Sequence, residues 1–440
     1  MKSFLNKYKE VYILGIGGSG MSSIAKFLHQ SGVHTKGYDQ RTSYVTDLLS
    51  NDGLSIELNI SNNIYNQDTL YIVSSAINIK DTFLKNHIGS ANVLTRPEFL
   101  DEITKHFNVV GITGTHGKTS STALLAHIYN FNNIPASYIF GGITSFGGVG
   151  GNFAGYEYPL ILETDEAFNT FENFKINTLL ATNIDFDHID HYGSFENLVD
   201  AFKSVILKVE NNTVLNLDDK SLKLISKDSH ITYSKEKGSD FQLLGGNEIL
   251  VNSKKYKINT KLIGKHFISN ITGVIALAYL NGISIEDSLS AIEHFDGVKR
   301  RAEFIGEFNR VKIYDDYAHH PTEIISTINS FKEFSEGRLI TIFQPHRYTR
   351  TKDNFNELKA SLELSDISIV TDIYSAGEKP IPGVNSANFA SEKIKYLKSP
   401  RMVPHFLRDI IKEGDLILTL GAGDITLLGP QVLKYFNEKN

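Results

Sequence analysis

The stretch VVGITGTHGKT, residues 109–119, decides the fold of this chain. Its first four residues predict a buried strand, and the apolar periodicity of residues 121–129 predicts a helix after the loop. A glycine-rich turn between a strand and a helix forms an anion site, because the backbone N–H groups of the turn and the helix N-terminus face one concave space. We therefore predict that this loop holds nucleotide phosphates.

Two side chains of the loop strengthen that prediction. Lys118 places a positive charge near the outer phosphates, and the hydroxyl of Thr119 is a suitable Mg²⁺ ligand. Ile112 stands where the strict pattern GxxxxGK[ST] has its first glycine, so the loop has the shorter form GxxGK[ST]. The alternative is a glycine-rich turn beside a surface lysine, and the flanking strand and helix favour the phosphate loop.

A second glycine-rich loop, GIGGSG at residues 15–20, follows a strand-like run and opens a helical one. Its spacing fits GxGxxG, and Asp39 lies about 20 residues on, where an acid that binds a ribose is found. The pattern alone favours a dinucleotide such as NAD. The physical requirement is only a pyrophosphate at a helix N-terminus, so a UDP-sugar fits equally well, and tight strand–helix packing is a third explanation.

Acidic and amide residues follow two predicted strands of the same unit. Glu163 follows the strand 159–162, and NIDFDHIDHY, residues 183–192, follows the strand 178–181. Ligands of open α/β sheets bind beyond the carboxyl ends of the strands, so Glu163 and His188 are candidates to reach Mg²⁺. A solvated strand end for Glu163, and a helix cap or core position for His188, are the alternatives.

A third group lies toward the C-terminus. DDYAHHPTE (residues 315–323) and FQPHRYTRT (residues 343–351) each follow a strand-like run. Only ten of the 44 basic residues are arginine, and four of these fall in two short motifs: Arg300, Arg301, Arg347 and Arg350. Arginine suits carboxylates and phosphates, so the clustering predicts an anion site, with surface salt bridges as the alternative.

Composition excludes several classes of protein. The 440 residues include no cysteine, which excludes a disulfide framework, a thiolate zinc site and a cysteine nucleophile, and suits a reducing cytoplasm. The net charge is −6 without a basic run, so we expect no nucleic-acid partner. We expect no signal peptide and no membrane insertion, because no apolar run reaches the roughly 18–20 residues that span a bilayer.

At about 100–200 residues per domain, the length predicts two to four domains, and three is the natural choice. Strand-like and helical runs alternate along the chain, which indicates parallel α/β units. We place their boundaries at 1–107, 108–296 and 297–440. The further predicted strands are 11–14, 35–38, 69–73, 93–94, 311–314, 338–343, 367–371 and 415–420, with helices at 21–28 and toward the end of 262–280.

Taken in order, the motifs resemble those of the Mur ligase family over essentially the whole chain. They are GIGGSGMS, SSAI, TGTHGKT, TNIDFDHIDHYG, GVKRR, DDYAHHPTE, FQPHRYTRT, YSAGE and GAGDI. The two longest C-terminal motifs are typical of the branch that adds alanine. The resemblance implies an α/β fold of three domains: an N-terminal Rossmann-like domain that binds a UDP-sugar, a central P-loop domain that binds ATP, and a C-terminal Rossmann-like domain that admits the amino acid.

The implied reaction joins L-alanine to the carboxylate of UDP-N-acetylmuramate through an acyl phosphate, with ATP as substrate and Mg²⁺ as cofactor. We expect a cytoplasmic protein, because the chain has no cysteine, and leave monomer and homodimer open. The resemblance implies catalytic roles for Lys118, His188, Arg300, His319, Arg347 and Arg350, and metal ligation by Thr119, Glu163 and His188. ATP would contact Gly114, Thr115, His116, Gly117, Lys118, Thr119, Ser120, His266, Asn270 and Arg301. The UDP-sugar would contact Gly15, Gly17, Gly18, Ser19, Gly20, Asp39, Ser74, Ser75 and Arg96. The amino-acid pocket would comprise Tyr317, His319, His346, Arg347 and Arg350.

The chain departs from the family pattern at two places. In GKHFISN, residues 264–270, Phe267 replaces the asparagine of GxHNxxN. In ETDEAFNTF, residues 163–171, Ala167, Phe168 and Asn169 stand where EADESDGSF has Ser, Asp and Gly, which removes polar groups. These changes leave open a sibling ligase that recycles a murein tripeptide, and a UDP-sugar-binding regulator without catalysis. A nicotinamide-dependent oxidoreductase would explain GIGGSG but not TGTHGKT.

Overall fold

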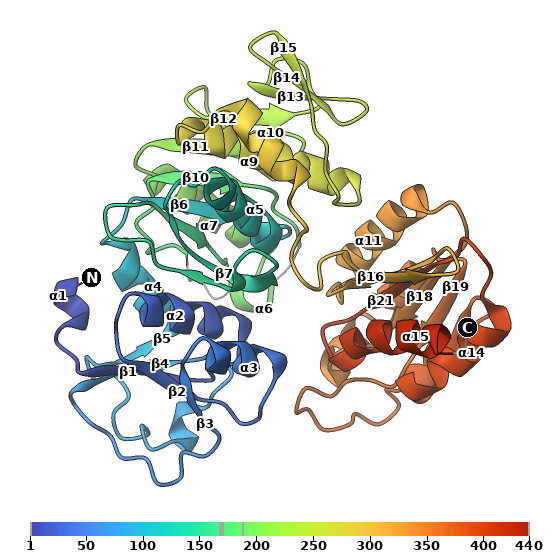
Figure 1. Cartoon of the computed structure of the whole chain (residues 1–440), viewed down its shortest axis with the longest axis horizontal. Coiled ribbons are helices and arrows are strands. Elements are labelled where there is room, and N and C mark those ends of the chain that lie inside the picture. Colours follow the sequence, from blue (N-terminus) through green and yellow to red (C-terminus); the bar gives the residue numbers. More distant parts are fainter. Residues whose placement is uncertain (1, 167–170, 187–188, 439–440) are drawn as a thin grey trace. The chain divides into compact units, whose positions relative to one another are not determined.

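The computed structural model describes residues 2–166, 171–186 and 189–438 (Figure 1). In this part of the chain the strands form three sheets with helices packed around them. The predicted class, α/β with three sheet-containing domains, is confirmed. By their contacts, the residues group into two compact units. One runs to Lys261 and includes Ile268–Asp296, and the other comprises Leu262–Phe267 and Gly297–Asn440.

The N-terminal sheet has five parallel strands in the order β3-β2-β1-β4-β5. Three of its four predicted strands end where we expected, and β5 extends one residue further. The elements are α1 (Lys2–Leu5), β1 (Glu10–Leu14), α2 (Ser19–Gln30), β2 (Thr35–Tyr38), α3 (Tyr44–Asn51), β3 (Ser55–Glu57), β4 (Thr69–Val73), η1 (Ile79–Asp81), β5 (Val93–Thr95) and α4 (Arg96–Thr104).

The central sheet has ten strands in the order β15-β14-β13-β12-β11-β10-β6-β9-β7-β8. Its middle is parallel, and antiparallel strands flank it on both edges. The strands are β6 (Val109–Thr113), β7 (Ser137–Thr144), β8 (Gly148–Asn152), β9 (Leu160–Glu163), β10 (Thr178–Ala181), β11 (Asn212–Asn216), β12 (Ile231–Ser234), β13 (Phe241–Leu244), β14 (Glu248–Val251) and β15 (Lys254–Lys257). The helices are α5 (Lys118–Phe131), α6 (Ile189–Tyr192), α7 (Phe195–Lys208), α8 (Lys220–Ile225), α9 (Lys265–Leu280) and α10 (Ile285–Glu293).

The C-terminal sheet has six strands in the order β16-β17-β21-β18-β19-β20, and only β16 is antiparallel. The strands are β16 (Glu303–Phe308), β17 (Val311–Asp316), β18 (Leu339–Phe343), β19 (Ile367–Val370), β20 (Ile394–Tyr396) and β21 (Leu416–Leu420). The helices are α11 (Pro321–Phe334), α12 (Tyr348–Asp353), α13 (Phe355–Leu362), α14 (Val403–Ile410) and α15 (Leu428–Asn437), with 3₁₀ turns η3 (Ser386–Phe389), η4 (Pro400–Met402) and η5 (Asp424–Leu427).

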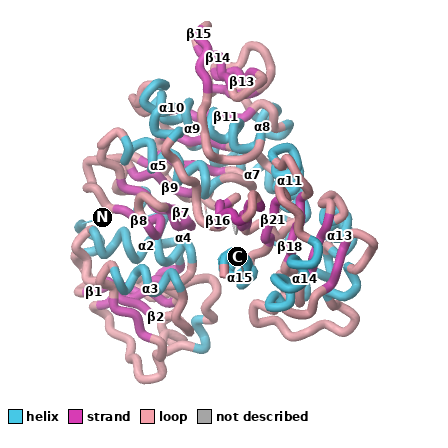
Figure 2. Tube along the Cα trace, turned by 45° about the vertical axis from the view of Figure 1, so that its right-hand side comes forward, coloured by secondary structure: helices cyan, strands magenta, loops and turns pink. Residues whose placement is uncertain are grey.

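Helix α2 joins the first two sheets into one unit. It packs on β7 and β8 (Figure 2), where a Cβ on Gly151 would lie 2.1 Å from the backbone oxygen of Ser23. Lys26 donates from Nζ to the Gly147 carbonyl oxygen at 2.6 Å. Phe27 meets Phe107 edge to face at this junction, within one hydrophobic cluster that spans both sheets. Gly151 of β8 therefore allows the close approach of α2 to the central sheet.

Among the residues described, no helix is both long enough and apolar enough to cross a lipid bilayer. The longest helix, α9 (Lys265–Leu280), has 16 residues.

Candidate active site

The TGTHGKT loop lies at the carboxyl end of β6 in a conformation that requires glycine. Gly114 has φ +134° and Gly117 has φ +84°, both in the region that side chains disfavour. A Cβ on Gly114 would lie 2.0 Å from the Thr182 hydroxyl. The loop is thus pressed against the end of β10, and its backbone can turn toward a phosphate.

Asn183, two residues beyond β10, fastens the loop on its other side. Its Oδ1 accepts from the His116 backbone N–H at 2.9 Å, and its Nδ2 donates to the His116 carbonyl at 2.9 Å. The backbone N–H of Thr115 also donates to the Asn183 carbonyl at 3.0 Å. One amide therefore satisfies both backbone groups of the residue at the tip of the loop.

Lys118 folds back over the loop. Its ammonium donates to the carbonyls of Gly114 (2.8 Å) and Thr115 (3.2 Å) and to both oxygens of Glu166 (3.0 and 2.7 Å). Burial lowers the pKa of Lys118, but the charges of Glu166 and Asp165 outweigh it and raise that pKa to about 12. The lysine is therefore a fixed positive charge within the phosphate loop.

Thr119 and Glu163 form an oxygen pair beside the lysine. The Thr119 hydroxyl donates to Oε1 of Glu163 at 2.6 Å, and Oε2 of Glu163 accepts from the Gly141 backbone N–H at 2.6 Å. The end of β9 is one residue later than predicted, so Glu163 is the last residue of the strand. A hydroxyl and a carboxylate at this distance are ligands of the kind that Mg²⁺ prefers.

The other predicted metal ligand, His188, lies outside the described residues, as do Ala167, Phe168 and Asn169. Among the side chains that the structure describes, no group of three or more histidine or acidic residues is arranged to hold a metal ion. Metal ligation by Thr119 and Glu163 therefore stays a prediction.

The remaining predicted ATP contacts fall into two sets. His116 bonds Oδ2 of Asp185 through Nε2 at 2.9 Å. Asn270, in α9, lies against the loop, because a Cβ on Gly117 would come within 2.3 Å of its Nδ2. Ser120 lies in the first turn of α5. His266 and Arg301 group instead with the C-terminal unit, where Nδ1 of His266 lies 3.3 Å from the Ser330 hydroxyl of α11.

The GIGGSG loop gathers the residues predicted for the UDP-sugar. Asp39 accepts from the Gly17 backbone N–H at 2.9 Å. A Cβ on Gly15 would touch Ser74, and one on Gly20 would lie 2.7 Å from Nε of Arg96. That Nε is buried without a hydrogen-bond partner in the described structure, so it is a donor directed into the loop.

Helix α2 begins at this loop with its N-terminal N–H groups uncovered by a side-chain cap. Gly18 is the N-cap residue and makes no such bond, and the first turn, starting at Ser19, contains no acid. Ser75, beside Ser74, is exposed. An uncapped N-terminus next to a buried arginine donor is suited to a phosphate or pyrophosphate.

The GIGGSG loop and the Glu163 end of β9 approach each other at Gly141. A Cβ on Gly141 would lie 3.6 Å from the Ser19 hydroxyl and 3.5 Å from Oε2 of Glu163. Ser19 opens α2, whereas Glu163 ends β9. The predicted UDP-sugar loop and the predicted metal carboxylate are therefore neighbours across a single glycine.

In the C-terminal unit, three motifs meet around Tyr317. The guanidinium carbons of Arg300 and Arg301 lie 4.9 and 5.1 Å from the centre of its ring. Arg300 has φ +63° and donates from Nη2 to the carbonyls of Gly421 (2.6 Å) and Gly423 (3.1 Å). GVKRR, DDYAHHPTE and GAGDI are thus brought together, and the anion site expected from the clustered arginines stays a prediction.

Two histidines of this unit lie close together, and each has a lowered pKa. The rings of His319 and His346 are 6.0 Å apart between centres. Burial lowers the pKa of His319, and burial together with the charges of His319, Arg350 and Arg347 lowers that of His346 to about 4. His346 stacks on Tyr374 of YSAGE at 5.5 Å, and its buried Nδ1 makes no hydrogen bond to the described residues.

Arg347 is fastened by a carboxylate. Its Nε donates to Oε1 of Glu378 at 2.6 Å, and Thr349 donates to the same carboxylate through N–H (3.0 Å) and hydroxyl (2.7 Å). A joint grip of one anion by Arg347 and Arg350 stays a prediction. Arg350 is the arginine whose charge acts on both His319 and His346.

Three residues that contact the predicted site residues were not predicted from the sequence: Glu166, Asn183 and Glu378. Glu166 and Asn183 stand in acidic and amide stretches that we identified, but their partners lie 48 and 67 residues away in the sequence. Glu378 belongs to YSAGE, which contributed to the resemblance without a role. The signal in each case was a polar residue just beyond a strand or in a quoted motif.

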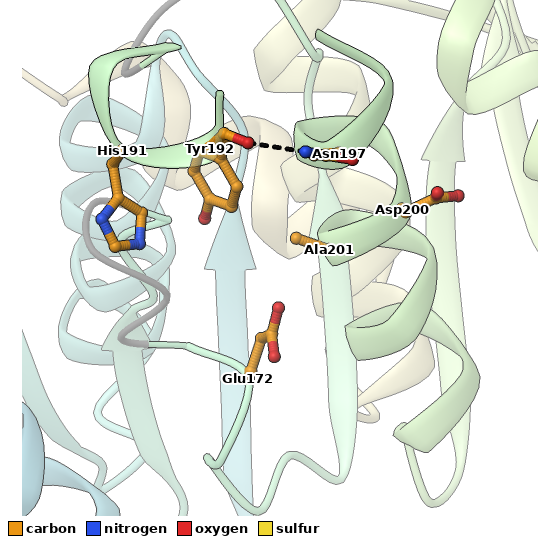
Figure 3. Close-up of a pocket in the computed structure, with 6 residues that line it drawn as sticks. All are labelled: Glu172, His191, Tyr192, Asn197, Asp200 and Ala201. Atoms are coloured by element: carbon orange, nitrogen blue, oxygen red, sulfur yellow. Dashed lines mark hydrogen bonds between the residues drawn. The ribbon is translucent and has the colours of Figure 1, made fainter. Parts of the chain in front are cut away.

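A pocket of about 360 Å³ lies at α6 and α7, and none of the predicted site residues lines it (Figure 3). It is lined by Glu172, His191, Tyr192, Asn197, Asp200 and Ala201. In Figure 3, the Asn197 amide meets the Tyr192 carbonyl, a bond of 2.7 Å. The Tyr192 hydroxyl donates to the backbone carbonyl of Glu166 at 2.5 Å. Tyr192 therefore links the pocket wall to the segment that holds Lys118.

Comparison with known proteins agrees with these motifs. Three family models match in order: "Mur ligase family, catalytic domain" at residues 10–108, "Mur ligase middle domain" at 112–278, and "Mur ligase, glutamate ligase domain" at 300–423. UDP-N-acetylmuramate–L-alanine ligases of Vesicomyosocius okutanii and Ruthia magnifica are 33% and 35% identical to this chain, with 98% of each chain covered.

Solved structures agree as well. UDP-N-acetylmuramate-alanine ligase from Thermotoga maritima superposes with a TM-score of 0.81 at 25% identity, covering 98% of this chain and all of that one. A murein peptide ligase from Psychrobacter arcticus, at 22% identity, shares the fold, with a TM-score of 0.69 over 97% of this chain and 98% of that one. The chain belongs to the Mur ligase family.

Proposed function

We propose that this protein is the ATP-dependent ligase that joins L-alanine to UDP-N-acetylmuramate in peptidoglycan precursor synthesis. The observation behind this proposal is the Thr119–Glu163 oxygen pair beside Lys118, in a chain whose full-length relatives are named for this reaction. A phosphate loop with a lysine and a carboxylate matches the use of ATP, and the C-terminal cations match a carboxylate-bearing amino acid.

The chemistry needs activation, because a carboxylate does not condense with an amine in water. A carboxylate oxygen of UDP-N-acetylmuramate attacks the γ-phosphorus of ATP, and ADP leaves. The neutral amine of alanine then attacks the acyl-phosphate carbonyl, and the tetrahedral intermediate expels phosphate while the amine loses its proton. Such a reaction depends mainly on positioning and on neutralising charge.

In the central domain, Lys118 and the backbone N–H groups of the loop would bind the ATP phosphates. Thr119 and Glu163 would hold Mg²⁺, and their hard oxygen atoms, 2.6 Å apart, fit this ion. When bound, Mg²⁺ neutralises charge on phosphate oxygens. His188 as a further ligand stays a prediction. Asn270, against Gly117, supports a nucleotide at the same loop.

The N-terminal loop would bind the UDP pyrophosphate at the start of α2, with Arg96 as a side-chain donor. Ser19, next to Gly141, would face both substrates. In the C-terminal unit, burial lowers the pKa of both His319 and His346, so the arginines would be the charged partners for the alanine carboxylate and the transferred phosphate. A pKa of about 4 makes His346 a group that positions the substrate rather than a base for the alanine amine.

The alternative acceptor, a murein tripeptide, has no specific support among the described residues, since the departure at 167–169 lies outside them. The domain boundaries, the cytoplasmic location and the monomeric or homodimeric state stay predictions.

Phosphate release with UDP-N-acetylmuramate, Mg²⁺-ATP and a panel of amino acids and peptides tests the proposal. We expect L-alanine to give the highest kcat/KM, and Lys118→Ala to abolish turnover because the phosphates lose their fixed charge. A clear preference for the tripeptide L-alanyl-γ-D-glutamyl-meso-diaminopimelate would overturn the choice of acceptor, and full turnover in the lysine variant would overturn the assignment of the loop.

A further inference from the structure

The ammonium of Lys118 is saturated by acceptors that belong to the protein. A lysine has three N–H donors, and four oxygen atoms lie within 3.2 Å of Nζ: two backbone carbonyls and both oxygens of Glu166. A phosphate oxygen can therefore bind this ammonium only by replacing one of them. The carbonyls of Gly114 and Thr115 belong to the loop itself, so the exchangeable partner is the carboxylate.

Glu166 is built into this position. Its side chain is fully buried, and the Tyr192 hydroxyl donates to its backbone carbonyl. Tyr192 is buried too, and Asn197 at the start of α7 holds its carbonyl (Figure 3). The carboxylate thus lies on a braced segment next to the phosphate loop, and a buried carboxylate is retained at a large desolvation cost unless a cation accompanies it.

We propose that Glu166 is a positioning residue that competes with nucleotide phosphate for the Lys118 ammonium. The proposal rests on the function proposed for the loop and adds a regulation of that site. On binding, the phosphate displaces the carboxylate from at least one donor of Lys118. On release, Glu166 takes that donor back, which assists departure of the product nucleotide.

This exchange predicts an effect opposite in sign to that of a purely structural residue. In Glu166→Gln the side chain keeps its shape but loses its charge, so it holds Lys118 more weakly and repels phosphate less. We expect Mg²⁺-ATP to bind about tenfold tighter, the size of one hydrogen bond between charged groups. We also expect both kcat and the KM for ATP to fall, because the product nucleotide leaves more slowly.

A neighbouring carboxylate provides the matched control. Oδ1 of Asp165 lies 3.7 Å from Nζ of Lys118, beyond hydrogen-bond distance, and the side chain is one-third exposed. Asp165→Asn makes the same change of charge beside the same lysine without removing a hydrogen bond to that lysine. We expect it to change the Kd of Mg²⁺-ATP by about twofold at most. A third variant, Tyr192→Phe, removes the brace and should tighten binding in the same direction as Glu166→Gln, by less.

Titration calorimetry of Mg²⁺-ATP with the full-length wild-type protein and these variants tests the proposal, with steady-state turnover as the second measurement. Tighter binding with lower kcat in Glu166→Gln, and little change in Asp165→Asn, supports it. Unchanged or weaker binding in Glu166→Gln overturns it, as does equal tightening by both variants, which would indicate general charge repulsion. If Glu166→Gln does not fold, unchanged or weaker binding in Tyr192→Phe overturns it. Failure of the wild-type protein to bind Mg²⁺-ATP would instead overturn the proposed function of the loop.

Discussion

Asn183 provides a sharp test of how the phosphate loop is held. Its amide makes two hydrogen bonds to the backbone of His116, each 2.9 Å long. Asn183→Ala removes both, and each is worth about 0.5–1.5 kcal/mol, which gives a loss of about 1–3 kcal/mol in total. The loop must hold this conformation to bind phosphate, so the loss is expected to reduce ATP affinity by about 5- to 150-fold.

An asparagine at the other end of β10 provides a matched control, because it also makes two side-chain hydrogen bonds. Asn177 precedes β10, and it too fastens β6: its Oδ1 accepts from the Val109 N–H at 2.7 Å, and its Nδ2 donates to Glu210 at 2.6 Å. This asparagine lies at the opposite, amino end of the two strands. Asn177→Ala removes a comparable pair of bonds far from the loop, so it should lower the thermal midpoint of unfolding while leaving ATP affinity within about twofold of the wild-type value.

Titration calorimetry of Mg²⁺-ATP, with thermal unfolding of each variant, measures both effects. The reasoning is refuted if Asn183→Ala binds ATP as tightly as the wild-type protein. It is refuted equally if Asn177→Ala weakens ATP binding to the same extent, because the effect would then come from the sheet as a whole. A further variant, Asn183→Asp, keeps one acceptor but opposes a carboxylate oxygen to the His116 carbonyl, and it should bind ATP more weakly than Asn183→Ala.

Three further predictions concern the metal, the histidines and the arginine motif. Glu163→Gln should raise the Mg²⁺ concentration needed for half-maximal phosphate release by at least about 10-fold, and an unchanged Mg²⁺ titration would contradict this ligand. The pKa of His346 in the folded protein, about 4, lies below the ordinary histidine value of 6.5. The unfolded chain therefore takes up a proton first as pH falls from 6.5 to 4, and stability is lost across that window. After discounting for solvent screening, we expect the free energy of unfolding to fall between pH 7 and pH 5 by about 1–2 kcal/mol less in His346→Asn than in the wild-type protein. Urea unfolding at pH 5 and 7 measures this difference. An equal pH dependence in the variant and the wild-type protein would argue against it. Partial burial raises the pKa of Glu378, but hydrogen bonds from Thr349 and Arg347 outweigh the effect of burial and lower the pKa to about 2. Glu378→Gln should therefore raise KM for L-alanine about tenfold at pH 7 while KM for ATP stays unchanged, and an equal rise in both would contradict a role confined to the amino-acid pocket.

Much of the fold follows from the sequence because its strands are short apolar runs that end in glycine or polar residues. β2, β4 and β10 match the predicted ranges to the residue. The antiparallel strands β13, β14 and β15 were not predicted. Their residues alternate between buried and partly exposed, and β15, KKYK, is largely solvated, so they lack the apolar run that marks a buried parallel strand.

The site residues also fall into two groups, those that the sequence predicts and those that it does not. Motif spacing identifies groups that a short loop brings together, such as Lys118 and Thr119. It does not identify a partner supplied by another strand end, such as Glu166, because that contact depends on the order of strands in the sheet. β9 and β10 flank β6 in the central sheet, and this order places the residues after all three strands at one edge. The general rule for open sheets predicts that Thr119, Glu163 and His188 lie near one Mg²⁺, but only the sheet order shows that Glu166 and Asn183 contact the phosphate loop.

The distribution of charge explains how a chain with a net charge of −6 can serve anionic substrates. In both compact units, cations predicted for the site are accompanied by carboxylates: Lys118 by Glu166, and Arg347 by Glu378. Such a cation presents little net field at a distance, so long-range attraction is a poor explanation for substrate capture. We therefore expect binding to depend on local exchange, in which a phosphate or carboxylate of correct geometry replaces a protein carboxylate or shares its cation. That arrangement favours ligands that also meet the backbone N–H groups of the loops, and it discriminates against anions that offer charge alone.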